Sequence, residues 1–175
     1  MKDLSQKRTS SEQIRIICIT AIFATLITIM TAYVCHIPVP ITGGYLHFGD
    51  SLIYLAATLL PTPYAFAAAA IGGGLADLLT APMWTIPTIL IKMLITLPFT
   101  NKGNTIITIR NVIAPFIAYL ISGTGYYLCS KLIFGHEVAF LTSILGSAVQ
   151  SLGSGVFFVI FGLVLDKMHF KKRFI

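Results

Sequence analysis

The sequence predicts an all-α integral membrane protein that has six transmembrane helices and both termini in the cytoplasm. Of its 175 residues, 56% are hydrophobic and only 10% are charged, whereas about 25% are charged in a typical soluble domain. So few charges cannot cover a surface that faces water. The apolar residues also fall into stretches long enough to cross a bilayer, and basic residues flank them.

Most of the positive charge lies outside the apolar stretches. The net charge of +6 comes largely from basic residues near the two ends of the chain: Lys2, Lys7, Arg8, Arg15, Lys167, Lys171, Lys172 and Arg173. Basic clusters beside membrane spans set their orientation by the positive-inside rule. We therefore expect a multi-pass protein of the bacterial cytoplasmic membrane, in contact with membrane lipid, and no binding of nucleic acid.

Six apolar stretches are expected to cross the membrane, where a helix needs roughly 20 apolar residues. They cover residues 14–36, 50–60, 63–80, 85–100, 105–134 and 138–166. The first stretch is longer than the apolar region of a signal peptide, so we interpret it as a membrane span. The charge pattern supports an even number of spans. It does not separate six spans from four, because the second stretch is short.

Breaks rich in proline, glycine or polar residues separate the stretches, as is usual for turns between helices. In chain order they read HIPVPITGGYLHFG, PTP, TAPMW, TNKGN and GHE. The TNKGN turn carries Lys102 and is expected on the cytoplasmic side. The chain thereby divides into a cytoplasmic tail, a membrane domain and a basic cytoplasmic tail, at residues 1–13, 14–166 and 167–175.

Polar and aromatic side chains gather toward the outward ends of these stretches. In the expected topology that side holds His47, Asp50, Asp77, Trp84, Lys92, Tyr126, Tyr127, His136 and Gln150. Charged residues inside a membrane are costly, and they usually face an interior, a partner or a ligand. The gathering therefore indicates a small-molecule site that opens to the outside of the cell.

Each of these residues could also have a purely structural role. Asp50 could cap the second helix, and Asp77 and Lys92 could form an ion pair between helices. The aromatic residues could anchor helices at the membrane surface, and the histidines could be solvated in loops. Gln150 could hydrogen-bond to a neighbouring helix.

The motifs of common enzymes are missing from the sequence. It has no G-x-x-x-x-G-K-[ST], no H-E-x-x-H and no G-x-S-x-G. Cys18, Cys35 and Cys129 are scattered and match no disulfide or zinc pattern. The glycines of IGGGLAD lie inside an apolar stretch, which favours helix packing over phosphate binding. We expect a protein that is not an enzyme and that uses no cofactor and no metal.

Three sequence blocks resemble the S components of energy-coupling factor (ECF) transporters, in particular the riboflavin-type branch. The blocks are GYLHFGDSLIYLAATLL, AAIGGGLADLL and MWTIPTILIK, within about residues 43–93. The matching positions are Gly44, Tyr45, Gly49, Asp50, Ile53, Leu55, Ala56, Ala57, Gly72, Gly73, Ala76, Asp77, Leu78, Leu79, Trp84, Pro87, Ile91 and Lys92.

The resemblance implies a six-helix subunit that captures a vitamin-like solute outside the cell and delivers it with a coupling membrane subunit and two ATPase subunits. Its ligand would lie beneath the loop between the first two spans. Asp50 and Asp77 would be structural or ion-pairing residues. Riboflavin is the default ligand, and pyridoxine, a thiamine pyrimidine precursor and cobalamin or its fragments remain alternatives. The candidate substrate-binding residues are Tyr45, His47, Trp84, Lys92, Tyr126, Tyr127, His136 and Gln150.

Small residues in the first stretch form the expected docking surface for the coupling subunit. Thr20, Ala24 and Thr28 are four residues apart, and such a stripe lets membrane helices approach closely. In the family the corresponding stripe is often A-x-x-x-A, so this chain has a threonine-substituted version. Two rival functions stay open: a stand-alone ion-coupled transporter that uses Asp50 and Asp77, and a membrane scaffold without a ligand.

Overall fold

The computed structural model describes residues 9–34, 36–39, 44–134 and 139–174. Within them the regular structure is helical apart from one short antiparallel hairpin, in which Ile37 faces Leu46 and Val39 faces Gly44. The elements in chain order are α1 (Ser10–Ala32), β1 (Ile37–Val39), β2 (Gly44–Leu46), α2 (Asp50–Leu59), α3 (Thr62–Thr80), η1 (Pro82–Trp84), α4 (Thr85–Leu94), α5 (Ile109–Phe134), α6 (Ala139–Lys167) and α7 (Phe170–Phe174).

Two helix ends differ from the expected bounds for identifiable reasons. Helix α1 begins at Ser10 and not at residue 14, because Thr9 and Glu12 form a reciprocal capping box. Helix α4 ends at Leu94 and not at residue 100. A turn and Pro98 follow it, and proline cannot continue the backbone hydrogen bonding of a helix. Arg110 instead donates to the carbonyl oxygen of Pro98 at 2.8 Å.

Only some of the helices are long enough to span a bilayer alone. Among the described residues, three helices are long and apolar enough, at Ser10–Ala32, Ile109–Leu132 and Ser143–Lys167. Helices α2 and α4 have 10 residues each, which makes each about 15 Å long, half of the roughly 30 Å hydrocarbon core. Large exposed apolar side chains, such as Leu132 at 86% and Ile86 at 73%, are consistent with a surface that faces lipid.

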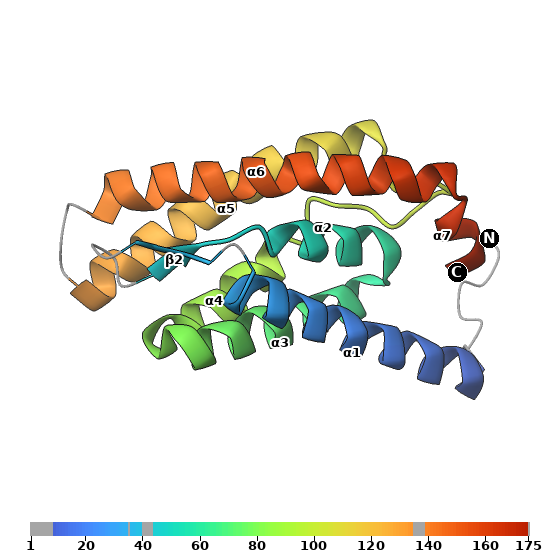
Figure 1. The fold of residues 1–175 in the computed structure, drawn as a ribbon, viewed down its shortest axis with the longest axis horizontal. Coiled ribbons are helices and arrows are strands. Elements are labelled where there is room, and N and C mark those ends of the chain that lie inside the picture. Colours follow the sequence, from blue (N-terminus) through green and yellow to red (C-terminus); the bar gives the residue numbers. More distant parts are fainter. Residues whose placement is uncertain (1–8, 35, 40–43, 135–138, 175) are drawn as a thin grey trace, which may run out of the picture.

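The two ends of the molecule are built from different segments. In Figure 1 the first turn of α1 and the whole of α7 lie at one end, on the right, which we call the terminal end. The hairpin, the last turn of α5 and the first turn of α6 lie toward the other end, which we call the hairpin end. Polar residues are buried near both ends, in two separate networks.

Helix α2 is the centre of the core. Nine of its ten residues are buried, and it packs against α1, α3 and α6. Tyr54 stacks on Phe99 with ring centroids 4.6 Å apart and meets the edge of Phe158 at 6.0 Å. A helix that is apolar all round is stable only where other elements surround it. This position explains why the shortest apolar stretch of the sequence lies inside the bundle.

The glycines of α3 bring that helix close to two neighbours. A methyl group on Gly72 would lie 2.7 Å from Ile27 Cβ of α1, and one on Gly73 would lie 2.9 Å from Lys92 Cγ of α4. Both distances are too short for a side chain, so α3 packs between α1 and α4 only because these positions lack one. The IGGGLAD segment is therefore a packing motif, and it makes room for the stem of Lys92.

At the terminal end, side chains hold the segment that joins α4 to α5. The carboxylate of Asp166, near the end of α6, accepts from the backbone N–H groups of Ile106 at 2.7 Å and Ile107 at 2.9 Å. Asn111 donates to the carbonyl oxygen of Ile106 at 2.8 Å. Lys171 of α7 donates to the carbonyl oxygen of Thr105 at 3.1 Å. We call Asn111, Asp166 and Lys171 the terminal clamp.

Candidate ligand-binding site

A buried ion pair lies near the hairpin end. Lys92 Nζ of α4 is 2.6 Å from Asp50 Oδ1 of α2, and the two side chains are 1% and 0% exposed. Gln150 Nε2 of α6 donates to the second oxygen, Asp50 Oδ2, at 3.1 Å. Both oxygens of the carboxylate are therefore engaged, as a buried charge requires. We call Asp50, Lys92 and Gln150 the charged triad; it joins three helices that are distant in the sequence.

Two expectations from the sequence are corrected by this geometry. The ion-pair partner of Lys92 is Asp50, and not Asp77 as the sequence suggested. Asp50 does not cap α2, because Gly49 occupies the cap position and no side-chain capping bond is formed. The reason in both cases is packing: the first turn of α2 is buried, and there the carboxylate meets Lys92, which reaches in from α4, and Gln150 of α6.

Asp77 belongs to a second polar chain beside the triad. Thr88 Oγ1 of α4 donates to Asp77 Oδ2 of α3, and the same hydroxyl lies 2.9 Å from the Tyr126 hydroxyl of α5. Thr88 was not among the residues selected from the sequence. It could have been found, because Thr88 and Lys92 are four residues apart and so share one face of their helix.

Aromatic rings complete this region. Trp84 packs edge-on against Tyr126 with centroids 5.8 Å apart, and Lys92 Nζ lies 5.8 Å from the centre of the Tyr126 ring. Trp84 is 6% exposed, so it packs inside the protein, whereas an anchor at the membrane surface would be exposed. Tyr127, the next residue, is half-buried and points about 100° around α5 from Tyr126.

His47 is buried, with 5% of its surface exposed, so it is not the solvated loop residue that the sequence allowed. The backbone N–H of Gly49 donates to His47 Nδ1 at 3.0 Å. Burial, and next the positive charge of Lys92, lower the pKa of His47 from 6.5 to about 3. The imidazole is therefore neutral near pH 7 and carries its proton on Nε2, which makes that nitrogen a hydrogen-bond donor.

Three of the selected substrate-binding residues are not placed in this site, and Tyr127, which points away from Tyr126 around α5, is one of them. Tyr45 lies in β2, where its backbone pairs with Pro38, and its side chain is outside the described part of the structure. His136 also lies outside the described residues. The structure thus brings together His47, Asp50, Trp84, Lys92, Tyr126 and Gln150, either by direct contact or through a shared neighbour.

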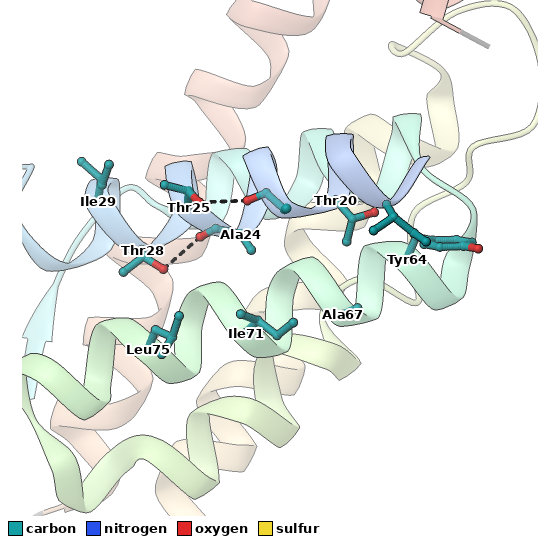
Figure 2. Close-up of a pocket in the computed structure, with 11 residues that line it drawn as sticks. Thr20, Ala24, Thr25, Thr28, Ile29, Tyr64, Ala67, Ile71 and Leu75 are labelled. Atoms are coloured by element: carbon teal, nitrogen blue, oxygen red, sulfur yellow. Dashed lines mark hydrogen bonds between the residues drawn. The ribbon is translucent and has the colours of Figure 1, made fainter. Parts of the chain in front are cut away.

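The expected docking stripe faces α3 more than it faces outward. Thr20 and Ala24 are buried, and Thr28 Oγ1 donates to the carbonyl oxygens of Ala24 at 2.9 Å and Gly72 at 3.1 Å. An apolar groove of about 560 Å³ runs between α1 and α3 beside this stripe (Figure 2). Its lining residues are Ile17, Thr20, Ala21, Ala24, Thr25, Thr28, Ile29, Tyr64, Ala67, Ile71 and Leu75.

The fold and the site define a class: a lipid-embedded helical protein with an internally paired polar site and no catalytic constellation among the described residues. The model of the family described as "ECF-type riboflavin transporter, S component" matches residues 11–167. The chain belongs to this family, whose members are substrate-binding membrane subunits and not enzymes. The all-helical membrane fold expected from the sequence is confirmed at this level.

A curated relative covers a smaller part of the chain. The relative is a protein of Pyrococcus woesei with the description "Uncharacterized protein in gap 3'region". It is 38% identical to this chain over 63 residues. The match covers 36% of this chain and 43% of that protein. The chain therefore spans less than half of the relative's length, and the relative's description assigns no ligand or activity.

Proposed function

We propose that this chain binds riboflavin, or a flat heterocyclic vitamin of the same kind, and passes it to an ECF coupling subunit driven by two ATPase subunits. The observation that carries the proposal is the triad with its aromatic neighbours: a buried cation, an amide and two packed rings, in a chain of the riboflavin S-component family. The ligand would lie beneath the hairpin. The chain would cross the membrane six times, with the hairpin end facing outward.

The site residues divide into two roles. Asp50 and Lys92 satisfy each other, because both carboxylate oxygens are already engaged, and they would form part of the wall of the ligand site. Trp84 and Tyr126 would stack on the ring system of the ligand, which supplies most of the affinity of such pockets. Gln150 and His47 would orient it. The bond of Gln150 to Asp50 uses one of the four hydrogen bonds that its amide can form.

The geometry favours a binding subunit over an ion-coupled transporter. A coupled carboxylate must exchange its ion or proton during transport, whereas Asp50 is held by Lys92 and Gln150 and is fully buried. A scaffold without a ligand would gain nothing from a buried charge pair that apolar residues could replace. The pair is therefore better explained as part of a preorganised site.

Ligand binding is tested first on the purified full chain. We expect stoichiometric binding of riboflavin, seen as quenched flavin fluorescence, and a flavin that copurifies and is identified by mass spectrometry. Trp84→Leu should weaken binding at least tenfold, because one stacked aromatic contact is worth about 1 kcal/mol and the pocket loses area as well. Met83→Leu, at an exposed neighbouring side chain, is the control. A chain that binds no vitamin of a panel would overturn the proposal.

The groove between α1 and α3 is the proposed docking surface for a helix of the coupling subunit. Its exposed small residues are Ala21 and Thr25, the second of which is labelled in Figure 2. Leucine at either position would fill the groove. Ala24 is a poorer probe, because its carbonyl oxygen lies against Gly72 and a larger residue there would disturb the fold.

Uptake by cells that contain the ATPase module separates docking from binding. Ala21→Leu should abolish vitamin uptake and leave ligand affinity within about twofold of the wild-type value, a change below 1 kcal/mol. The reason is that α3 lies between α1 and Lys92 of α4, and Ala21 is an exposed residue of the groove. Ile22→Ala, at an exposed residue outside the groove, should change neither. Normal uptake by the Ala21→Leu variant would show that the partner docks elsewhere.

A further inference from the structure

The segment between β2 and α2 packs onto glycine positions of α6. Phe48 Cε1 lies 2.7 Å from where a methyl group on Gly153 would be, and Leu46 Cδ2 lies 3.5 Å from the same point on Gly146. The Phe48 ring also meets Phe157, with centroids 5.1 Å apart. Gly153 thus forms a notch that receives the edge of the Phe48 ring and that no other residue type would leave open.

These contacts share one face of α6 with the site. Gly146, Gln150, Gly153 and Phe157 are spaced by four, three and four residues, which places them along a single helix face. Gln150, between the two glycines, is the residue that donates to Asp50 at 3.1 Å. The contact of Phe48 with α6 therefore helps to set the positions of His47, which precedes it, and of Asp50, which lies two residues further on.

The Phe48 contact is suited to opening. Phe48 is only half-buried, whereas His47 and Gly49 beside it are buried. The contact of one ring with a glycine and a second ring is small compared with the packing of α2, which is buried along nearly its whole length. Local opening occurs where few apolar contacts must be broken.

We propose that Phe48 and the Gly153 notch form a latch. The latch holds the segment between β2 and α2 against α6 and thereby sets the rate at which the ligand dissociates. Phe48 is a positioning residue in this inference. The inference rests on the proposed function, because it places the ligand beneath the hairpin segment. It adds a kinetic role for two residues that have no part in the charged triad.

Dissociation kinetics test the latch on the full chain in nanodiscs. We expect Phe48→Ala and Gly153→Ala each to speed riboflavin dissociation about tenfold, as loss of a packed aromatic contact does, with association changed less than about threefold. The double variant should be no faster than the faster single variant, because both changes break one contact. Unchanged dissociation in Phe48→Ala would overturn the inference.

Gly155→Ala is the matched control. Gly155 lies on the same helix, and a methyl group there would be equally crowded, 2.8 Å from Pro115 Cβ of α5. It disturbs helix packing without touching Phe48. If Gly155→Ala accelerates dissociation as much as Gly153→Ala does, the effect is general loosening and the latch is wrong.

A second readout needs no ligand. Cysteine is introduced by Leu46→Cys in a chain whose own Cys18, Cys35 and Cys129 are replaced by serine, and its rate of modification by a maleimide is measured. The rate should rise with Phe48→Ala or Gly153→Ala and stay unchanged with Gly155→Ala. A rate that none of them changes overturns the latch. If the maleimide rate rises in Phe48→Ala and Gly153→Ala but the wild-type chain binds no flavin, the latch stands and the proposed ligand is wrong.

Discussion

The two ends of the bundle bury polar groups in different ways. At the hairpin end, the triad joins side chain to side chain: Lys92 to Asp50, and Gln150 to Asp50. At the terminal end, the clamp joins side chains to the backbone: Asp166 to two N–H groups, and Lys171 to the carbonyl oxygen of Thr105. Each pattern satisfies buried polar groups, but only the first consists entirely of groups that a mutation can remove.

The terminal clamp and the triad serve different purposes. Backbone groups cannot be removed, so where the connecting segment between α4 and α5 is buried, as at Ile106, some partner must satisfy them. The clamp is therefore required by the fold. The triad is required by nothing in the backbone, since apolar residues of similar volume could fill its space. Its presence is better explained by the site that it borders.

The largest effect is expected from breaking the triad on one side. Lys92→Met leaves the buried Asp50 carboxylate without its cation and should lower the free energy of unfolding by about 3–5 kcal/mol. Adding Asp50→Leu should recover most of that loss, because the double variant buries no charge. Both are measured by thermal unfolding in detergent, with Lys102→Met at an exposed position as control. If the double variant is less stable than Lys92→Met, the triad is a requirement of the fold and the comparison fails.

Unlike the triad, the terminal clamp should not regain stability when a second residue is also replaced. Asp166→Leu removes the acceptor of the Ile106 and Ile107 N–H groups and should cost about 2 kcal/mol. No second substitution can compensate, because the orphaned donors belong to the backbone. The neighbouring exposed residue Lys167, changed to alanine, is the control. Stability equal to wild type in Asp166→Leu would mean that water replaces the carboxylate and that the clamp is dispensable.

A pH effect of intermediate size is expected at the hairpin end alone. The pKa of His47 is about 3 when folded and 6.5 in its unperturbed state, so the unfolded chain binds more protons between these values. Stability should therefore fall as the pH drops below 6.5, by about 1.4 kcal/mol per unit. His47→Gln should remove this slope, while His36→Gln should keep it. A wild-type melting temperature that stays flat from about pH 7.5 to about pH 5.5, across the ordinary titration range of histidine, would contradict the assignment.

The smallest effect is expected at the last residue of the clamp. Lys171→Met keeps the aliphatic stem and loses one hydrogen bond to the carbonyl oxygen of Thr105, so it should cost about 1 kcal/mol. Lys172→Met, at the exposed next residue, should cost nothing measurable by the same unfolding assay. A loss in Lys171→Met as large as that of Lys92→Met would show that the two ends do not differ in kind.

Parts of the site could be predicted from the sequence, because charged and polar residues in an apolar chain are conspicuous. His47, Asp50, Lys92 and Gln150 were selected in this way, and the structure brings them together. Their pairing could not be predicted. The expected topology places Asp77 and Asp50 at the same end of the bundle. Only the packing of α2 against α1, α3 and α6, which brings Asp50 within reach of α4, decides which carboxylate meets Lys92.

The sequence by itself determined the class of protein and the approximate positions of its helices. Composition, apolar stretches and flanking charges depend only on transfer between water and lipid, which each segment undergoes on its own. The tertiary structure alone decided the partner of Lys92, the notch that Gly153 offers to Phe48, and the burial of Thr20 and Ala24 against α3. Those contacts join residues that are far apart in the chain, and a local pattern carries no information about which helix faces will meet.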